Sequence, residues 1–234
     1  MTALLIAGTD TDVGKTFVTI ALASYWQKYH RPQDRTQNLS IFKLMQTGKG
    51  DVELYNRLFA QEQGIEIVAP LLFDAPLAPP IAAAKEGKTI DLGKVWQAFN
   101  KLQQETSLVL LESLGGLGSP VSNELTVGNI AADWRLPTVL VVPVKLGAIA
   151  NVVANVALAR SLNIDLKGII LNCSQAQSQE IEDLTPIGLI QSLTQMPVIG
   201  TLPYIENPAQ TDKIASIVSN WDIELILPQG AIAL

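Results

Sequence analysis

The stretch that decides the fold is Gly8-Thr9-Asp10-Thr11-Asp12-Val13-Gly14-Lys15-Thr16. It follows a short apolar run, Leu4–Ala7, and precedes a helical pattern over Phe17–Tyr29. A glycine-containing turn between a strand and a helix presents successive backbone N–H groups, and the positive end of the helix, to an anion. The stretch therefore predicts a phosphate-binding loop, in which Lys15 reaches the β- and γ-phosphates of a nucleotide and the Thr16 hydroxyl binds Mg²⁺.

The spacing of this loop leaves a second interpretation open. The strict phosphate-loop pattern has four residues between its first glycine and Gly-Lys. Here five residues separate Gly8 from Gly14, and Thr9 stands where the first glycine is expected. The alternative is a plain strand-to-helix turn that happens to contain Gly-Lys-Thr. The strand before the stretch and the helix after it favour the phosphate-binding interpretation.

Short apolar runs recur along the chain and alternate with helical patterns. The runs are rich in Val, Ile and Leu and contain few polar residues, which is typical of strands buried on both faces of a parallel sheet. The expected strands are Leu4–Ala7, Leu39–Met45, Leu108–Leu111, Thr138–Val144, Gly168–Leu171 and Val198–Leu202. The expected helices are Phe17–Tyr29, Val52–Gln63, Gly93–Thr106, Ala148–Leu162 and Ile187–Gln195. The alternation predicts a doubly wound α/β fold, with a mostly parallel sheet flanked by helices.

The same pass along the chain bears on its division into domains. The stretch Ala75–Pro80 carries three prolines and is expected to be a loop. The sequence has no internal repeat and no linker long enough to divide it. We therefore expect a single domain over residues 1–234.

The composition excludes several classes of protein. Hydrophobic residues make up 48% of the 234 residues and charged residues 16%, which excludes a disordered chain. The net charge of −6 argues against a nucleic-acid-binding surface that spans the protein. One cysteine and one histidine exclude an intramolecular disulfide and a metal site built from Cys or His.

Hydropathy gives an expectation about location. A run of about 18 apolar residues, which a membrane-spanning helix needs, is absent from the sequence. The first apolar run is short and is followed by Asp10 and Asp12, unlike a signal peptide. We therefore expect a cytoplasmic protein without a membrane or nucleic-acid partner.

Ligands bind such sheets at the carboxyl ends of the strands, so the residues that follow each apolar run are the first candidates. Lys43 and Thr47 lie at the end of the second run, in Lys43-Leu44-Met45-Gln46-Thr47-Gly48. Lys43 is either a ligand-binding cation or an edge lysine whose ammonium extends to solvent. Asp51 is either the N-cap of the next helix or a ligand of Mg²⁺. Glu112 closes the third run before glycines and is either a Mg²⁺ ligand beside the phosphates or an ordinary strand-end glutamate.

Later strand ends give weaker signals. Lys145-Leu146-Gly147 opens the helix over Ala148–Leu162, and the N-terminus of that helix is a second candidate anion site. The alternative is a plain connection between a strand and a helix. Asn172 ends the following strand, where an amide can contact a nucleotide base, and no Asn-Lys-x-Asp follows to indicate a guanine-specific GTPase. Pro203 follows the last strand and is most simply part of a turn.

Taken in this order, the motifs resemble those of the dethiobiotin synthetase family. Gly8–Thr16 fits the family's loop, Gly-Thr-Asp-Thr-Glu/Asp-Val-Gly-Lys-Thr, including its extra residue. Lys43–Gly48 is similar to Lys-Pro-x-x-Ser/Thr-Gly, with leucine in place of proline. Leu111–Gly116 is similar to Val-Glu-Gly-Ala-Gly-Gly, with Ser-Leu in place of Gly-Ala. The resemblance covers nearly the whole chain, and the loop is its most specific part.

Two further departures from the family pattern bear on substrate binding. Pro80 stands where histidine is common in the family. Ala148–Asn151 stands where the family often has Thr-Ile-Asn-His, so that Ala150 replaces an asparagine. Both departures concern affinity for the substrate more than phosphoryl chemistry.

The resemblance implies a P-loop NTPase fold and an ATP-dependent cyclo-ligase of biotin biosynthesis that acts as a homodimer. The family uses ATP, Mg²⁺ and CO₂ to close the ureido ring of 7,8-diaminononanoate, through a carbamate and a carbamic–phosphoric anhydride. Carried over to this sequence, the resemblance implies catalytic roles for Lys15 and Lys43 and ligation of Mg²⁺ by Thr16, Asp51 and Glu112. The nucleotide-binding residues that it implies are Thr11, Asp12, Val13, Gly14, Lys15, Thr16, Glu112, Asn172 and Pro203. The substrate-binding residues that it implies are Thr11, Thr47, Lys145, Gly147 and Asn151.

Two other classes of enzyme compete with this interpretation. A partner-regulated switch ATPase of the ParA/MinD kind carries an additional lysine in the loop, where Asp10 stands here. Such an ATPase often has a basic or amphipathic surface segment, and none is evident in the sequence. An amidotransferase-linked synthetase needs a reactive cysteine, and Cys173 has no matching histidine signal.

Overall fold

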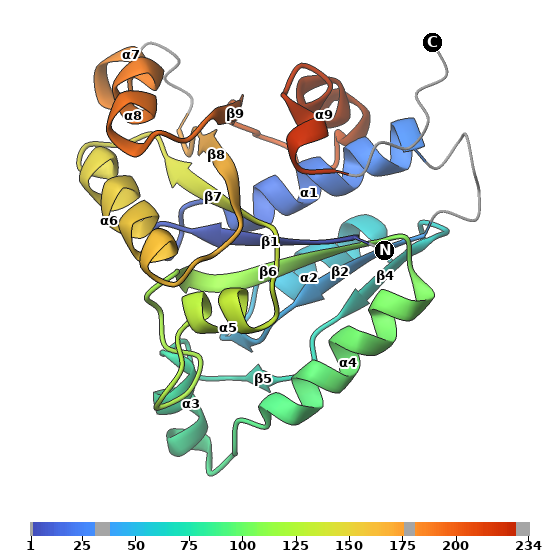
Figure 1. Cartoon of the computed structure of the whole chain (residues 1–234). Helices are drawn as coiled ribbons and strands as arrows, with labels where there is room; N and C mark the ends of the chain where they lie inside the picture. The colour runs from blue at the N-terminus through green and yellow to red at the C-terminus, as the bar shows by residue number, and fades with distance from the viewer. Residues whose placement is uncertain (1, 31–37, 176–180, 228–234) are drawn as a thin grey trace.

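The fold is built around one large sheet (Figure 1). The computed structural model describes residues 2–30, 38–175 and 181–227. Within them, seven strands form a sheet in the order β4-β2-β6-β1-β7-β8-β9, and every neighbouring pair is parallel. The strands are β1 (Thr2–Gly8), β2 (Leu39–Lys43), β4 (Ile65–Val68), β6 (Leu108–Gly116), β7 (Thr138–Pro143), β8 (Leu166–Asn172) and β9 (Val198–Leu202). The predicted doubly wound, parallel α/β fold is confirmed.

Alternate residues of each strand face opposite sides of the sheet, and helices cover both sides. Leu5 and Ala7 of β1 belong to one core cluster, whereas Leu4 and Ile6 belong to the other. A strand that is buried on both faces needs apolar residues at every position rather than at alternate ones. This requirement explains why the strands appear in the sequence as continuous apolar runs.

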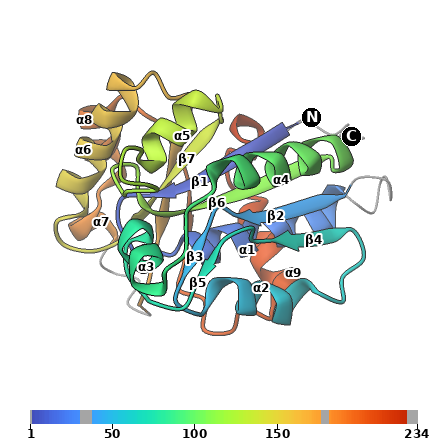
Figure 2. The same cartoon turned by 90° about the horizontal axis from the view of Figure 1, so that it is seen from below.

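The helices divide between the two faces (Figures 1 and 2). One core cluster includes residues of α4 (Leu92–Glu105), α5 (Val127–Asp133), α6 (Ala148–Ser161) and α8 (Ile187–Thr194). The other includes residues of α1 (Lys15–Tyr25), α2 (Asp51–Phe59) and α9 (Thr211–Val218). The remaining elements are a π-helical turn (Trp26–His30), β3 (Gln46–Thr47), β5 (Leu72–Phe73), α3 (Pro79–Glu86), α7 (Ile181–Leu184) and a 3₁₀ turn (Ile223–Leu225).

Three local predictions were wrong. Glu112 does not close its strand, because β6 continues through it to Gly116. The N-cap of α2 is Gly50, and Asp51 is the first residue of the helix. The expected loop Ala75–Pro80 contains the start of α3, whose first turn holds its two prolines. Proline is tolerated there because the first N–H groups of a helix have no partner within the helix.

Several elements were not predicted, among them β3, β4, β5, α3, α5 and α9. They are short, and most residues of β4 and α3 are partly buried or exposed, so their apolar patterns are weak. The helix α5 is mostly buried but has only seven residues. The strands that were predicted are the five at the centre of the sheet and the edge strand β9.

Candidate active site

The Gly8–Thr16 loop connects β1 to α1 at the carboxyl edge of the sheet. Gly14 is the N-cap of α1, and its φ of 92° lies in the left-handed region. A Cβ at Gly14 would overlap the amide of Asn172 on β8, so the position requires glycine. A Cβ at Gly8 would lie 2.9 Å from the carbonyl oxygen of Gly115, closer than real Cβ contacts. The loop is therefore a tight turn at a helix N-terminus, which is the geometry that binds phosphate.

Two asparagines hold this loop from the other half of the sheet. Asn172 donates from Nδ2 to the carbonyl oxygen of Val13 at 3.1 Å. Asn155 of α6 donates to the carbonyl oxygen of Thr9 at 3.3 Å and accepts from the N–H of Leu117 at 3.1 Å. Sequence reasoning missed Asn155, which lies one helical turn after Asn151. The loop is therefore joined to β8, to α6 and to the end of β6.

Lys15 lies over the loop with its ammonium turned back toward the backbone. The side chain is buried, and Nζ donates to the carbonyl oxygen of Asp10 at 3.1 Å. Within the described part of the chain, Lys15 forms no ion pair. Burial lowers the pKa of Lys15, and the Glu112 carboxylate partly offsets this effect. Lys15 therefore offers a charge without a direct counter-ion at the position predicted for the phosphates.

Four polar side chains from four elements meet beside the loop. Thr16 donates from Oγ1 to Oδ1 of Asp51 at 2.8 Å and lies 3.2 Å from Oε1 of Glu112. Lys43 donates from Nζ to Oε1 of Glu112 at 2.6 Å and also contacts Oδ2 of Asp51. The sequence singled out all four residues, and the structure brings them together. Lys43 is 4% exposed, which excludes the alternative of a lysine that extends to solvent.

Glu112 is the centre of this group and is completely buried. Its second carboxylate oxygen, Oε2, accepts hydrogen bonds from Thr19, at 3.2 Å, and from the hydroxyl of Tyr55. Sequence reasoning missed both donors. Helical spacing could have found them, because Thr19 lies one turn after Lys15 on α1 and Tyr55 one turn after Asp51 on α2. These bonds leave Oε1 facing Thr16 and Lys43.

The start of α2 is fixed by a second set of hydrogen bonds, and this positions Asp51. Gln46 of β3 accepts from the N–H of Val52 at 2.9 Å. Glu53 accepts from the N–H of Gly50 at 2.8 Å and from the amide of Gln46 at 3.1 Å. The first turn of α2 is thereby tied to β3 on both sides of Asp51.

The charges of the cluster influence one another. Burial would lower the pKa of Lys43, but Glu112 and Asp51 outweigh it and hold this pKa above its ordinary value. Burial would raise the pKa of Asp51, but Lys43 outweighs it and lowers this pKa. Burial raises the pKa of Glu112 against the opposing effect of Lys43. Because Lys43 contacts both carboxylates directly, the group is an ion-paired triad with Lys15 as a further cation nearby.

The cluster fits a magnesium ion. The hydroxyl of Thr16 contacts one oxygen of Asp51 and one of Glu112, so oxygens from three elements converge. Mg²⁺ prefers oxygen ligands and is usually held by one or two carboxylates together with the phosphates of a substrate. No group of three His, Cys, Asp or Glu side chains suited to a metal occurs in the described ranges. A site of two carboxylates and a hydroxyl therefore suits a metal that shares its ligands with a nucleotide.

The other predicted residues lie around this edge without direct contact to the cluster. Thr11 and Asp12 are exposed on the loop, and Thr47 is partly buried at the end of β3. Gly147 is the N-cap of α6, with a φ of 85°. The remaining predicted residues are Lys145, exposed before α6, Asn151, partly buried in its first turn, and Pro203, exposed after β9. Their predicted roles toward substrate and nucleotide stay predictions.

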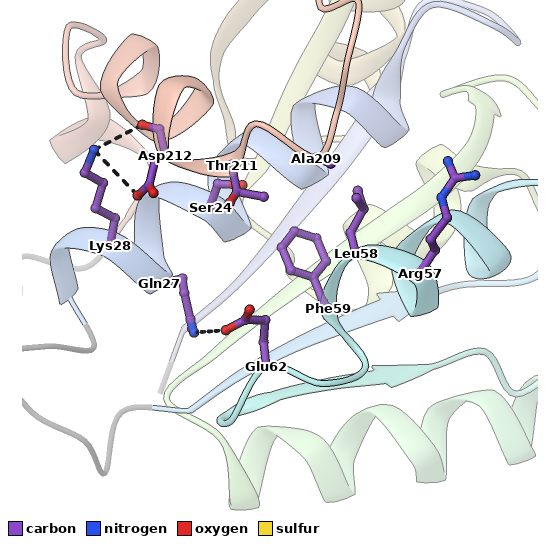
Figure 3. A pocket seen from close by; sticks show the side chains of 10 residues that line it. All are labelled: Ser24, Gln27, Lys28, Arg57, Leu58, Phe59, Glu62, Ala209, Thr211 and Asp212. Atoms are coloured by element: carbon purple, nitrogen blue, oxygen red, sulfur yellow. Dashed lines mark hydrogen bonds and ion pairs between the residues drawn. The ribbon is translucent and has the colours of Figure 1, made fainter.

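A separate cavity lies at the other end of α1 (Figure 3). It has a volume of about 390 Å³, lies between α1, α2 and the start of α9, and is lined by Ser24, Phe59 and Thr211 among others. Ser24 follows Lys15 by nine residues, which at 1.5 Å per residue is about 14 Å along the helix. The cavity contains none of the predicted site residues. It is therefore distinct from the phosphate-binding loop.

Across the described ranges, the structure contains no helix that is long and apolar enough to cross a membrane.

Solved structures with the same fold are distant in sequence. The MinC:MinD cell division complex of Aquifex aeolicus matches with a TM-score of 0.59 and 14% identity, over 98% of this chain and 99% of that chain. A ParA family ATPase from Chlorobium tepidum matches with a TM-score of 0.57 and 9% identity, over 93% and 90%. At such identities the likeness shows the fold alone, which is the predicted P-loop NTPase fold. It does not favour a switch ATPase.

Comparison with sequences identifies much closer relatives. The ATP-dependent dethiobiotin synthetase BioD of Gloeothece citriformis is 59% identical over 229 residues, which cover 97% of this chain and 100% of that protein. The protein of the same name from Crocosphaera subtropica is 55% identical over 227 residues, with 97% and 100% covered. A family model described as an AAA domain matches residues 2–212. The chain therefore belongs to the family of ATP-dependent dethiobiotin synthetases, and the predicted enzyme class, an ATP-dependent cyclo-ligase, is confirmed.

Proposed function

We propose that this protein converts 7,8-diaminononanoate and CO₂ to dethiobiotin, with ATP hydrolysed to ADP and phosphate and with Mg²⁺ as cofactor. The observation that carries the proposal is the convergence of Thr16, Lys43, Asp51 and Glu112 beside the loop that holds Lys15. The close relatives, which are dethiobiotin synthetases by name, support the same reaction and its place in biotin biosynthesis.

The reaction has three steps. One amine of the diamine adds to CO₂ and loses a proton, which gives a carbamate. A carbamate oxygen then attacks the γ-phosphorus of ATP, ADP leaves, and a carbamic–phosphoric anhydride forms. The second amine attacks the carbonyl carbon, phosphate leaves, a proton is released, and the ureido ring closes.

The second step needs cations more than it needs a nucleophilic side chain. Carbamate and γ-phosphate are both anions, and two unit charges about 4 Å apart repel by about 4 kcal/mol at an effective dielectric constant of about 20. Phosphoryl transfer is therefore accelerated mainly by positioning and by electrostatic stabilisation. In this proposal Lys15 contacts the phosphates, and Lys43 contacts the γ-phosphate and the carbamate. Mg²⁺ held by Thr16, Asp51 and Glu112 would neutralise charge on the phosphates.

The carboxylate end of the diamino acid is assigned to the start of α6. Gly147 has a left-handed φ there, and a Cβ added to it would meet nothing within 4 Å, so there is open space beside the turn. The N–H of Ala148 already donates to the carbonyl oxygen of Lys145 at 3.2 Å. The N-terminus of a helix of 14 residues favours an anion. Lys145 and Asn151 flank this turn, and Thr11 and Thr47 are assigned to the diamine. Asn172 and Pro203 are assigned to the nucleotide base.

We further propose that the protein acts in the cytoplasm as a homodimer. Both proposals rest on the family. Size-exclusion chromatography with light scattering tests the second: a mass near twice 25.2 kDa is expected, and a monomer at working concentration would contradict it.

The experiment that tests the reaction uses purified protein, ATP, Mg²⁺, ¹³C-bicarbonate and 7,8-diaminononanoate. We expect dethiobiotin with the label in its ureido carbonyl, detected by mass spectrometry, and one ADP per product. Release of ADP that does not depend on the diamine, without labelled product, would contradict the proposal. ATP-dependent binding to DNA or lipid vesicles in the same preparation would instead support a switch ATPase.

A further inference from the structure

The cation that lies between the two carboxylates of the site is an amino group of the protein itself. Lys43 contacts Oδ2 of Asp51 and lies 2.6 Å from Oε1 of Glu112. Oγ1 of Thr16 lies 3.2 Å from the same Oε1 and donates its proton to Oδ1 of Asp51 at 2.8 Å. The ammonium of Lys43 therefore contacts two of the side chains that would ligate a magnesium ion.

The ammonium and a metal ion cannot share these oxygens. Magnesium lies about 2.0–2.1 Å from its ligand oxygens and keeps near-ideal octahedral geometry. With Nζ of Lys43 at 2.6 Å from Oε1 of Glu112, a metal ion on that oxygen would stand against the ammonium. The two cations repel each other, and this side of the site is buried, with little water to screen them.

The balance of charge decides which cation the site holds. With both carboxylates ionised, the formal charges of Lys15, Lys43, Asp51 and Glu112 sum to zero. A magnesium ion alone would leave two excess positive charges in a largely buried place, which is unfavourable. A nucleotide that arrives with the metal supplies the missing negative charge, because its phosphates lie at the same loop.

We propose that Lys43 is a built-in counter-ion that occupies the metal position in the ligand-free protein and is exchanged for Mg²⁺ only when the nucleotide binds. The released ammonium then turns toward the γ-phosphate and the carbamate. Metal and nucleotide therefore load together, and the carboxylates are never left unpaired. This inference rests on the proposed function for the identity of the metal and the nucleotide.

The experiment measures binding of Mn²⁺, an oxygen-preferring divalent ion, to the full chain without nucleotide by electron paramagnetic resonance. The Lys43→Met variant, which keeps the length of the side chain without its charge, is expected to bind Mn²⁺ at least tenfold more tightly than the wild type. Lys49→Met is the matched control, because Lys49 is an exposed lysine in the same segment, and it should behave as the wild type does. The double variant Lys43→Met/Asp51→Asn should bind Mn²⁺ more weakly than Lys43→Met, because one of the two carboxylate ligands is removed.

Equal Mn²⁺ affinity of the wild type and Lys43→Met would overturn the proposal. If Lys43→Met does not fold, Mn²⁺ binding to the wild-type protein tests the proposal. Mn²⁺ bound to the wild type should appear only when ADP is added, in excess of the Mn²⁺ that ADP binds without protein. Stoichiometric Mn²⁺ binding to the wild type without ADP overturns the proposal. None of these measurements uses the diamine or bicarbonate. A failure of the exchange and a failure of dethiobiotin synthesis are therefore distinguishable.

Discussion

Glu112 shows how a carboxyl group is accommodated inside a core, where burial raises its pKa and Lys43 opposes that effect. Both of its oxygens accept hydrogen bonds, Oε1 from Lys43 and Oε2 from Thr19 and Tyr55, and Oγ1 of Thr16 lies 3.2 Å from Oε1. Removing one of these donors leaves a buried carboxylate oxygen with an unmade hydrogen bond. The resulting loss in the free energy of unfolding is larger than the contribution of a typical exposed hydrogen bond.

Tyr55→Phe isolates one of these donors. The ring stays and only the hydroxyl is lost, so we expect a loss of about 1.5–3 kcal/mol in the free energy of unfolding, the range for hydrogen bonds to charged groups. Urea unfolding at neutral pH measures it, with Tyr204→Phe as control because Tyr204 is 46% exposed. Equal loss in both variants would show that the hydroxyl of Tyr55 does not hold Glu112.

Lys43 is expected to contribute to turnover and not to nucleotide affinity. Lys43→Ala should bind ATP within a few-fold of the wild type, because Lys15 and the loop remain. Its kcat should fall about 100- to 1,000-fold, the cost of removing one group that stabilises charge in a transition state. Dethiobiotin production and binding of a fluorescent nucleotide analogue measure the two quantities, with Lys49→Ala as control. Turnover like that of the wild type would remove Lys43 from the reaction.

Asp51 should make stability depend on pH in a defined direction. Burial opposes the effect, but Lys43 lowers the folded-state pKa of Asp51. A carboxyl with a lowered folded pKa adds stability above its unfolded pKa, about 3.9, and loses it as the pH falls through the folded value. The stability difference between wild type and Asp51→Asn should therefore be largest near neutral pH and shrink below about pH 4. A difference that stays constant in urea unfolding across this range would contradict the ion pair, and Asp212→Asn is an exposed control.

At the scale of the element, the loop and α1 depend on a conformation that only glycine adopts freely. Gly14 and Gly87 both have positive φ, at 92° and 61°. A Cβ at Gly87 meets nothing within 4 Å, whereas one at Gly14 overlaps the amide of Asn172. The two glycines therefore separate the cost of the backbone conformation from the cost of the overlap.

Gly87→Ala should destabilise the protein by about 1–2 kcal/mol, the cost of the left-handed conformation for a residue with a Cβ. Gly14→Ala should cost more and also weaken nucleotide binding, because Asn172 must move and release Val13. Thermal unfolding and nucleotide titration of both variants test this. Gly14→Ala with the stability and affinity of Gly87→Ala would mean that the Asn172 contact does not shape the loop.

How far the sequence predicts an element depends on how completely that element is buried. The central strands were predicted because both faces are covered and every position is apolar. The edge strand β4 and the short β3 and β5 were not, because their residues are partly exposed and their patterns weak. Glu112 was expected at a strand end because a carboxylate interrupts an apolar run, yet partners from α1, α2 and β2 allow the strand to continue through it.

The residues that meet in the candidate site were singled out from the sequence, and their contacts were not. The sequence singled out Lys15 and Asp51 near the starts of expected helices, and Lys43 and Glu112 near the ends of apolar runs. That Lys43 would lie between the carboxylates could not be predicted, because Glu112 is 69 residues away in sequence and its strand must pair with β2 to bring the groups together. Asn155 went unnoticed for the same reason.

At the scale of the whole molecule, the acidic net charge of −6 coexists with a site for anions. A local arrangement of cations and helix N-termini creates positive potential whatever the total charge is. The loop that carries it is hydrogen-bonded to α6 and β8, and Asn155 of α6 also accepts from the N–H of Leu117 just after β6, so that the loop is linked to both halves of the sheet.

Binding at such a junction should stabilise the protein as one unit. Nucleotide with Mg²⁺ at about 100 times the dissociation constant should add about 2.7 kcal/mol, since a ligand that binds only the folded state stabilises it by mass action. For a chain of 150–250 residues, about 2–4 °C per kcal/mol gives a rise in Tm of about 5–11 °C. Calorimetry should show a single unfolding transition that moves to higher temperature without splitting, because the loop cannot be released without breaking its contacts to both halves of the sheet. A part of the protein that melts at its ligand-free temperature while the rest shifts would mean that the loop does not couple them. Lys15→Met, measured at the same nucleotide concentration, should lose most of the shift.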